Sequence, residues 1–230
     1  MQTKNPPSTR FSAELKTAEH MEPRFNLADY AVLMKPRVMS LVVFTALVGL
    51  LLALGSIDPW TATAAIVFIA RGAGAAGAIN MWYDRDIDLQ MSRTMNRPLP
   101  AGRMRPGPAL AFGIIMALAA VSSMAYYVNL VSAVLLLVTI LYYVFVYTVW
   151  LKRLTPQNVV IGGVSGALPP VVGWASVTGG IDSGALSLFL IIFLWTPPHS
   201  WALALYRRGD YEAAGVPLLP VAAWVQATKR

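Results

Sequence analysis

Six apolar stretches, each about 20 residues long, constrain the fold of this chain more than any other feature. They cover residues 38–57, 60–83, 108–127, 130–150, 159–177 and 186–206. A helix of about 20 apolar residues crosses the hydrocarbon core of a bilayer. The stretches are continuous rather than alternating, which argues against a transmembrane β-barrel. The sequence therefore predicts an all-α integral membrane protein, a bundle of about six transmembrane helices.

The composition agrees with a membrane protein and limits the other classes. Hydrophobic residues make up 57% of the 230 residues and charged residues only 13%, which is more apolar surface than a soluble domain can bury. There is no cysteine, so disulfides and thiolate chemistry are excluded. Residues 1–34 are polar, contain prolines and lack the apolar core of a signal peptide. We expect a flexible cytoplasmic leader there, followed by a membrane-embedded domain over residues 35–230.

Basic residues are distributed unevenly between the segments that flank these stretches. Of 18 Lys and Arg, 17 lie before the first stretch, in the loops after the second and fourth stretches, or in the tail after the sixth. This positive-inside pattern predicts that the N-terminus and the basic loops are cytoplasmic. The net charge of +7 is then a topology signal, and no nucleic-acid partner is expected. The mixed charge of the leader favours a bacterial inner membrane over a mitochondrial one.

Arg71 is the exception, a basic residue inside an apolar stretch. A charged side chain at such a depth is costly and usually faces the bundle interior or water. Because Arg71 precedes Asn80 by nine residues, one interpretation is that both side chains face the same cavity. The alternative is a side chain that snorkels to the interface or joins an internal ion pair.

Asn80, Asp84 and Asp88 are the strongest candidates for a functional site. They lie four residues apart at the end of the second stretch, so on a helix they share one face. An amide and two carboxylates suit Mg²⁺, which proteins usually hold through one or two carboxylates and substrate phosphates. An ordinary basic loop is the alternative, but such a loop would not need acidic residues aligned on one face of a helix, which we call the acidic stripe. Asp86 lies on the opposite side of the helix and is expected at most to support the metal ligands indirectly.

Further charged residues are expected at the same membrane edge. Arg93 and Arg97 follow the acidic stripe and are candidates for binding diphosphate. The other candidates for this role flank the first, fourth and sixth stretches: Lys35, Arg37, Lys152, Arg153 and Arg207. Asp210 follows the sixth stretch and is a candidate for a further metal ligand. Anchoring under the positive-inside pattern is the alternative for residues 35/37 and 152/153, and it accounts better for at least one of these pairs.

Three segments carry a resemblance to a known family. They are residues 80–103 (NMWYDRDIDLQMSRTMNRPLPAGR), 147–180 (YTVWLKRLTPQNVVIGGVSGALPPVVGWASVTGG) and 193–220 (FLWTPPHSWALALYRRGDYEAAGVPLLP). The N-x₃-D-x₃-D pattern of the first segment resembles the UbiA superfamily of intramembrane prenyltransferases. The strings TPQN, GALPP, TPPH and AGVPLLP are similar to the branch of that superfamily that attaches a farnesyl group to haem. The likeness covers nearly everything from Tyr30 onward.

The resemblance implies a UbiA-like helical bundle around a cavity that opens to lipid. It implies farnesyl diphosphate as donor, the vinyl group of haem B as acceptor, Mg²⁺ as cofactor and haem O as product. It also implies downstream partners, namely haem A synthase or the assembly of haem-copper oxidases. The residues that match the family's metal–diphosphate motifs are Asn80, Asp84, Asp88, Arg93 and Arg97, with Asp210 in the region of the second acidic motif.

His199, Tyr143 and Tyr147 are candidates for binding haem or the prenyl chain. His199 follows a Pro-Pro pair, which kinks a helix and opens room beside it. An intramembrane histidine is a functional candidate: it could ligate haem iron, act as a base, or only hydrogen-bond across helices. Tyr143 and Tyr147 are four residues apart. They are expected either to line a cavity and stabilise an allylic cation or, as the aromatic-rich end of the stretch favours, to lie at the membrane interface.

The chain departs from the family pattern in several ways. Tyr206 stands where the second acidic motif often has an aspartate, which makes a second metal position less well defined. Ser200 stands where an aromatic residue is expected after TPPH, and Arg71 in a stretch expected to be apolar. The family has about nine spans and this chain about six. We therefore expect a product that is incomplete at its C-terminus.

Two other functions remain open at this point. A UbiA-type prenyltransferase for another acceptor, such as a quinone precursor or chlorophyllide, would share the acidic stripe, but the TPPH and AGVPLLP strings argue against it. A non-enzymatic transport or assembly subunit is the second alternative. Acids confined to one membrane edge argue against an ion pathway, and an assembly role leaves the acidic stripe unexplained.

Overall fold

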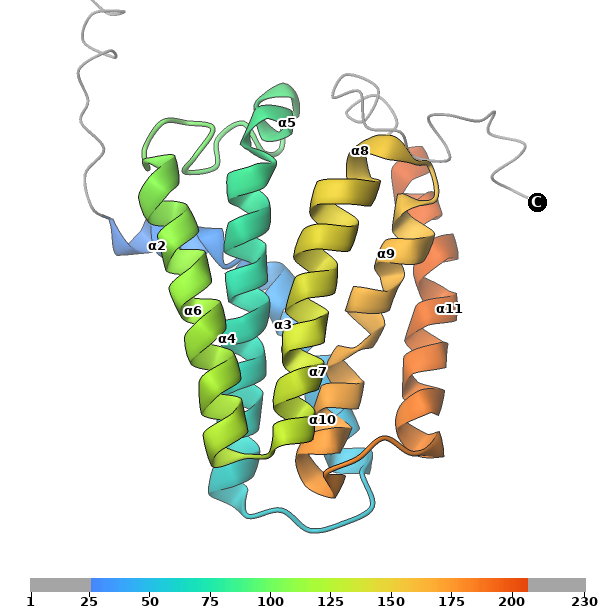
Figure 1. Ribbon diagram of the computed structural model, residues 1–230. Helices are drawn as coiled ribbons and strands as arrows, with labels where there is room; N and C mark the ends of the chain where they lie inside the picture. The colour runs from blue at the N-terminus through green and yellow to red at the C-terminus, as the bar shows by residue number, and fades with distance from the viewer. Residues whose placement is uncertain (1–25, 207–230) are drawn as a thin grey trace, which may run out of the picture.

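Helices are the only regular secondary structure in residues 26–206, the part of the chain that this computed structural model describes. In chain order the elements are α2 (Leu27–Leu33), α3 (Pro36–Leu52), α4 (Pro59–Tyr83), α5 (Arg85–Gln90), α6 (Pro106–Tyr127), α7 (Leu130–Leu141), the π-helix η1 (Tyr142–Leu151), α8 (Lys152–Leu154), α9 (Asn158–Ala167), α10 (Pro169–Thr178) and α11 (Ser183–Tyr206). The long helices stand side by side (Figure 1). We call the end that carries α5, α8 and the loop 91–105 the basic end.

The helices reproduce the six apolar stretches of the sequence. Five segments are long and apolar enough to cross a membrane: α4, α6, the continuous run α7–η1–α8, the pair α9–α10, and α11. α3 makes a sixth if it is joined to α2 across a bend of 54°. The predicted all-α integral membrane bundle is therefore confirmed for the described residues.

Helix α2 corrects one expectation from the sequence, because the flexible leader was predicted to extend to residue 34. The Asn26 side chain caps α2 by accepting from the N–H of Ala28 at 3.0 Å. Asp29 is buried and pairs with Arg103 at 3.2 Å, and Leu33 is also buried. These contacts tie the segment to the loop 91–105 and to α4, so it lies across the bundle as an ordered helix (Figure 1). The rest of the leader, residues 1–25, lies outside the described residues.

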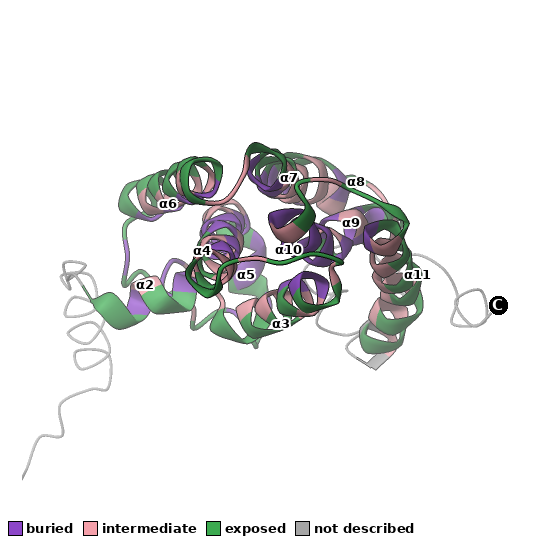
Figure 2. Ribbon diagram, turned by 90° about the horizontal axis from the view of Figure 1, so that it is seen from below, coloured by how far each residue is buried: buried purple, intermediate pink, exposed green. Residues whose placement is uncertain are grey.

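The closest helix contact joins α3 and α10 at the end of the bundle away from the basic end. Gly49 of α3 faces the carbonyl group of Pro170, and Gly173 of α10 faces the carbonyl group of Ala46. A Cβ atom at either glycine would lie 2.0 Å from the opposing oxygen, so neither position admits a side chain. Small residues are typical of membrane helix contacts because lipid supplies no hydrophobic driving force for association. Figure 2 shows buried residues on the inward faces of the helices and exposed residues on the outward faces.

Two of the predicted spans depart from regular α-helical geometry. The fourth passes from α7 into η1, where the Thr148 hydroxyl donates to the carbonyl of Tyr143, five residues earlier, at 2.9 Å. The fifth breaks between α9 and α10 at Leu168. Pro169 and Pro170 explain this break because they lack N–H groups. The π-helix was not predicted; such segments are rare and frequently mark functional sites.

Candidate active site

The end of α4 and the start of α5 present one buried polar stripe. Asn80 lies in the last turn of α4, Asp84 at the junction and Asp88 in α5. Backbone hydrogen bonds of 2.9 and 2.8 Å link each of these residues to the next, so helical spacing continues across the junction. The three residues are 3%, 1% and 2% exposed, whereas the side chain of Asp86 is 57% exposed. The three residues thus share the predicted face, and their metal-binding roles stay predictions.

Two lysines from distant parts of the chain contact the buried stripe. Lys35 donates to the Oδ1 atom of Asn80, and Lys152 pairs with the Oδ2 atom of Asp84. A carboxylate buried as deeply as that of Asp84 is costly unless it is paired and hydrogen-bonded. These contacts place both lysines in the site, so membrane anchoring alone does not account for them.

Two arginines extend this set of basic side chains. Arg97 pairs with Asp88 at 2.7 Å between Nη1 and Oδ2. Arg153 donates to both carboxylate oxygens of Asp86 at 2.8 Å, and its guanidinium lies over the ring of Tyr83 at 4.9 Å. The hydrogen bond from Arg153 is the largest cause that holds the pKa of Asp86 below its ordinary value. Arg153 also approaches the buried Oδ1 atom of Asp84, at 3.9 Å.

Lys35 connects the buried stripe with the interior of the bundle. It lies at the bend between α2 and α3, in a left-handed conformation with φ of 53°. The positive charges of Arg97 and Lys152 lie nearby. Because a bound anion would counter their repulsion, this position is electrostatically suited to a negatively charged ligand.

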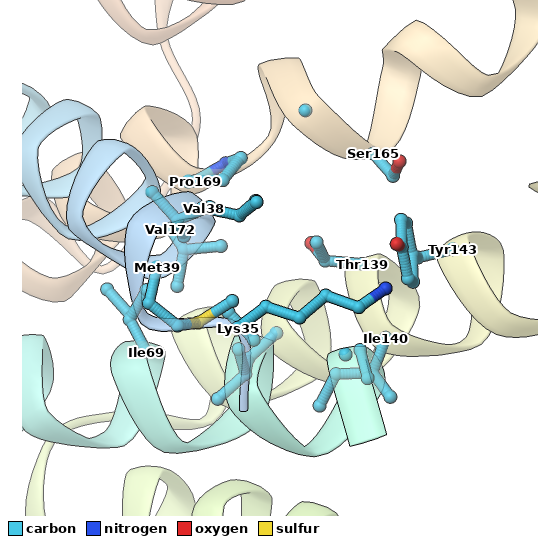
Figure 3. Close-up of a pocket in the computed structure, with 16 residues that line it drawn as sticks. Lys35, Val38, Met39, Ile69, Thr139, Ile140, Tyr143, Ser165, Pro169 and Val172 are labelled. Carbon is cyan, nitrogen blue, oxygen red and sulfur yellow. The ribbon is translucent and has the colours of Figure 1, made fainter. Parts of the chain in front are cut away.

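An apolar cavity of about 150 Å³ adjoins the stripe between α3, α4, α7, α9 and α10. Its wall is mostly aliphatic, as at Ile69 and Val172, and Lys35 and Tyr143 also line it. Figure 3 shows the Lys35 side chain extending through this space with its nitrogen near the ring of Tyr143. Gly166 borders open space, since no atom lies within 4 Å of a Cβ built there. A chain of carbon atoms can therefore enter the bundle with a charged end at Lys35.

Two of the predicted diphosphate ligands are exposed rather than buried. Arg37 is exposed at the start of α3, and Arg93 is exposed in the loop after α5. Arg71 is exposed on α4, so the interpretation that it shares a cavity with Asn80 is wrong. The remaining predicted residues, Arg207 and Asp210, lie outside the described residues.

The aromatic and imidazole candidates occupy different surroundings. Tyr143 lines the cavity. Tyr147 packs its ring against Tyr143, with centroids 5.5 Å apart, and against Gly162 of α9, where a Cβ atom would collide with the ring at 2.3 Å. His199 is exposed on α11, and its ring stacks on Trp195 at 4.1 Å between centroids.

Two buried threonines belong to the site although the sequence did not single them out. The Thr94 hydroxyl donates to the carbonyl of Asp88 at 2.8 Å. Thr148 accepts a hydrogen bond of 3.0 Å from the Nδ2 atom of Asn80. Both lie in the segments that resemble the family, but neither was assigned a role there, and the face that Thr148 presents depends on the π-helical register of η1. No signal in the sequence indicated that register.

The oxygen atoms of the stripe fit a divalent cation. Among residues 26–206 no group of three or more His, Cys, Asp or Glu gathers as a metal cluster, so the described donors are two carboxylates and the Asn80 amide. One of these atoms, Oδ1 of Asp84, is buried without a hydrogen-bond partner. A buried carboxylate oxygen without a donor is costly, and a cation would satisfy it. Hard oxygen ligands completed by substrate phosphates are the usual surroundings of Mg²⁺.

Comparison with known sequences places this site in a family. The model of the UbiA prenyltransferase family matches residues 42–230. The protoheme IX farnesyltransferase of Parvibaculum lavamentivorans is 56% identical over 223 residues, which cover 96% of this chain and 70% of the relative. The enzyme of the same name from Rhizobium rhizogenes is 60% identical over 201 residues, which cover 87% of this chain and 63% of the relative. The chain thus spans about two thirds of the length of these relatives.

Solved structures show the same fold. A UbiA homologue from Archaeoglobus fulgidus bound to GPP and Mg²⁺ superposes with a TM-score of 0.70 at 18% identity, over 87% of this chain and 71% of that chain. A digeranylgeranylglyceryl phosphate synthase superposes with a TM-score of 0.71 at 19% identity, over 87% and 70%. At these identities the likeness concerns the fold alone, and it confirms the predicted UbiA-like bundle.

Proposed function

Because the chain belongs to the UbiA prenyltransferase family, we propose that it transfers a farnesyl group from farnesyl diphosphate to the vinyl group of haem B, giving haem O. The observation that carries this proposal is the buried stripe of Asn80, Asp84 and Asp88, which faces basic side chains at the mouth of an apolar cavity. Relatives named protoheme IX farnesyltransferase support haem as the acceptor. UbiA homologue structures with GPP or DMAPP and Mg²⁺ support an allylic diphosphate and a divalent cation.

The polar end of the site is suited to hold and release diphosphate. Asn80, Asp84 and Asp88 would hold Mg²⁺, and Asp210 is proposed as a further ligand from the second acidic motif. When bound, Mg²⁺ would supply positive charge that stabilises the departing diphosphate. The basic residues that now pair with the stripe can turn to phosphate oxygens, because charge-assisted hydrogen bonds to phosphate are strong. They are Lys35, Lys152, Arg97 and Arg153, with Arg37, Arg93 and Arg207 proposed to extend the set.

The apolar cavity is suited to the farnesyl chain. Cleavage of the bond between C1 and oxygen leaves both bonding electrons on diphosphate and positive charge on the allylic carbons. The ring of Tyr143, with Tyr147 packed beside it, can stabilise that charge, and the surrounding helices exclude water from it. The haem vinyl group then donates its electron pair to form the new carbon–carbon bond. Water adds to the resulting cation, with loss of a proton, so no side chain of the protein has to act as a covalent nucleophile.

Three further parts of the proposal concern the surroundings of the enzyme. His199 is proposed to contact haem, because it is the candidate haem ligand whose imidazole stands exposed on α11. The N-terminus and the basic end are proposed to be cytoplasmic, in a bacterial inner membrane. Haem O would pass to haem A synthase or to the assembly of haem-copper oxidases. Because the chain has no cysteine, a single cysteine introduced into the loop 91–105 and labelled from one side of the membrane tests the orientation.

An assay with three components tests the reaction. Membranes that contain the protein are incubated with labelled farnesyl diphosphate, haem B and Mg²⁺, and the pigments are separated and weighed by mass spectrometry. We expect a labelled haem whose mass has increased by a farnesyl group and one hydroxyl group. Parallel reactions with a quinone precursor or chlorophyllide in place of haem B test the alternative acceptors. Product from one of these and none from haem B would overturn the proposed acceptor, and no product from any would favour a non-enzymatic role.

A further inference from the structure

Thr148 contacts the buried stripe from a neighbouring helix. It lies on η1 and is fully buried. Its hydroxyl oxygen accepts from the Nδ2 atom of Asn80 at 3.0 Å and donates to the carbonyl oxygen of Tyr143 at 2.9 Å. Thr148 is thus a hydroxyl group that joins a proposed metal ligand to the backbone of another helix.

The two hydrogen bonds of Thr148 determine how the Asn80 amide is oriented. A threonine hydroxyl has one proton, and the carbonyl of Tyr143 can only accept, so that proton is used there. Only lone pairs of the hydroxyl oxygen then remain to face Asn80. They require the NH₂ group of the amide, because the Oδ1 atom would place two acceptors against each other. The Oδ1 atom is consequently turned away from Thr148, toward Lys35.

The π-helical register makes this arrangement possible. The carbonyl that receives the Thr148 proton lies five residues earlier, whereas a threonine in an α-helix donates to a carbonyl three or four residues earlier. The second acceptor of the Asn80 NH₂ group is the Oδ2 atom of Asp84, at 2.8 Å. That atom also accepts from Lys152, so the Asn80 amide shares it with a charged donor. The Thr148 oxygen is the uncharged acceptor of the amide, and it belongs to no proposed metal ligand.

We propose that Thr148 is a positioning residue, which holds the Asn80 amide so that its Oδ1 atom faces the divalent cation. This inference rests on the proposed function, since it concerns the same metal–diphosphate site. Without the hydroxyl, the amide can rotate and present its NH₂ group, which repels a cation. Replacement of Thr148 therefore weakens metal binding without removing a metal ligand.

The test compares three substitutions in the whole chain. Thr148→Val keeps the shape of the side chain and replaces the hydroxyl with a methyl group. Thr148→Ala removes the hydroxyl and puts nothing in its place. Thr148→Ser keeps the hydroxyl. Mn²⁺ alone is titrated into the detergent-solubilised protein, and the free ion is measured by electron paramagnetic resonance. A lost neutral hydrogen bond corresponds to about a fivefold change in an equilibrium constant. We expect Thr148→Val and Thr148→Ala to raise the Kd for Mn²⁺ by about that factor, and Thr148→Ser to stay near the wild-type value.

Thr45→Val is the matched control, because the Thr45 hydroxyl donates within α3, to the carbonyl of Val42 at 3.1 Å. It should leave the Kd for Mn²⁺ unchanged. Wild-type affinity in both Thr148→Val and Thr148→Ala would overturn the inference alone. So would a Thr148→Ser protein as defective as Thr148→Val, since the methyl group and not the hydroxyl would then matter. A wild-type protein that binds no Mn²⁺ would overturn the proposed metal site, and this inference with it.

Discussion

The two sides of the candidate site are built in different ways. On the side of α4 and α5, the polar groups are buried and each contacts a basic side chain from another element. On the side of α11, His199 and its stacking partner Trp195 are exposed. The first side arises from four-residue spacing that continues from α4 into α5. The contrast teaches that the side of α4 and α5 is held in place by contacts among the described residues, whereas the side of α11 presents exposed rings.

The largest effect should come from neutralising the buried carboxylates. Asp84→Asn and Asp88→Asn keep the size of the side chain but remove a charge, and Asp84→Asn also leaves the half-buried Lys152 without its charged partner. We expect turnover to fall at least about 10²–10³-fold, with the protein still inserted in the membrane. Rates in the haem farnesylation assay and thermal unfolding in detergent measure the two properties. Near-normal turnover in either variant would mean that the buried stripe is structural.

The next effect concerns the cavity and is expected to differ between prenyl diphosphates of different chain length. Gly166→Leu adds a side chain that points into open space beside the cavity. We expect the ratio of kcat/KM for farnesyl over geranyl diphosphate to fall by about tenfold or more, since a few methylene groups in an apolar pocket carry about that discrimination. Gly107→Leu, at another position with no atom within 4 Å of the added Cβ, is the control. Equal loss for both donors would indicate that the cavity does not hold the chain end.

An effect on haem binding alone is expected on the side of α11. His199→Ala removes the exposed imidazole from α11. If His199 contacts haem iron, the Soret band of bound haem should shift and haem affinity should fall, with farnesyl diphosphate binding unchanged. Absorption spectra and titrations with each substrate measure this. An unchanged spectrum and affinity would leave only structural or acid–base roles for His199.

The smallest effect is expected at Asp86, which lies next to the stripe but faces outward. Asp86→Asn removes an exposed ion pair with Arg153, and such pairs contribute about 0–1 kcal/mol. The lowered pKa of Asp86 means that its contribution is present above its ordinary pKa of 3.8 and is lost as the pH falls below it. We expect nearly normal turnover at neutral pH, measured in the same assay. Loss as severe as that of Asp84→Asn would break the distinction between the buried and exposed carboxylates.

The sequence predicted the parts of the structure that follow from local periodicity. The spans and the shared face of Asn80, Asp84 and Asp88 depend only on apolar length and on four-residue spacing. The pairing of Lys35 and Lys152 with that face depends on contacts between residues 45 and 68 positions apart. Spacing carries no information about such contacts, so the sequence alone favoured membrane anchoring for at least one of the pairs 35/37 and 152/153.

The features that the sequence missed depend on departures from regular helices. Helix α2 is ordered by a tertiary ion pair between Asp29 and Arg103, which composition does not show. The role of Thr148 follows from a π-helical register, and an α-helical reading would have turned it elsewhere. Arg71 was weighed as a cavity residue because of its distance from Asn80 in sequence, but nine residues correspond to two and a half turns and not to the same face.

The break between α9 and α10 adds polar backbone groups to the cavity wall. Pro169 and Pro170 have no N–H groups, so the carbonyls of Ser165 and Gly166 lack the donors that a continuous helix would supply. Both residues line the cavity. An apolar surrounding penalises a carbonyl without a donor, and a water molecule is the smallest group that can satisfy it. The wall is therefore expected to be hydrated at this one place, where the backbone rather than any side chain orders the solvent.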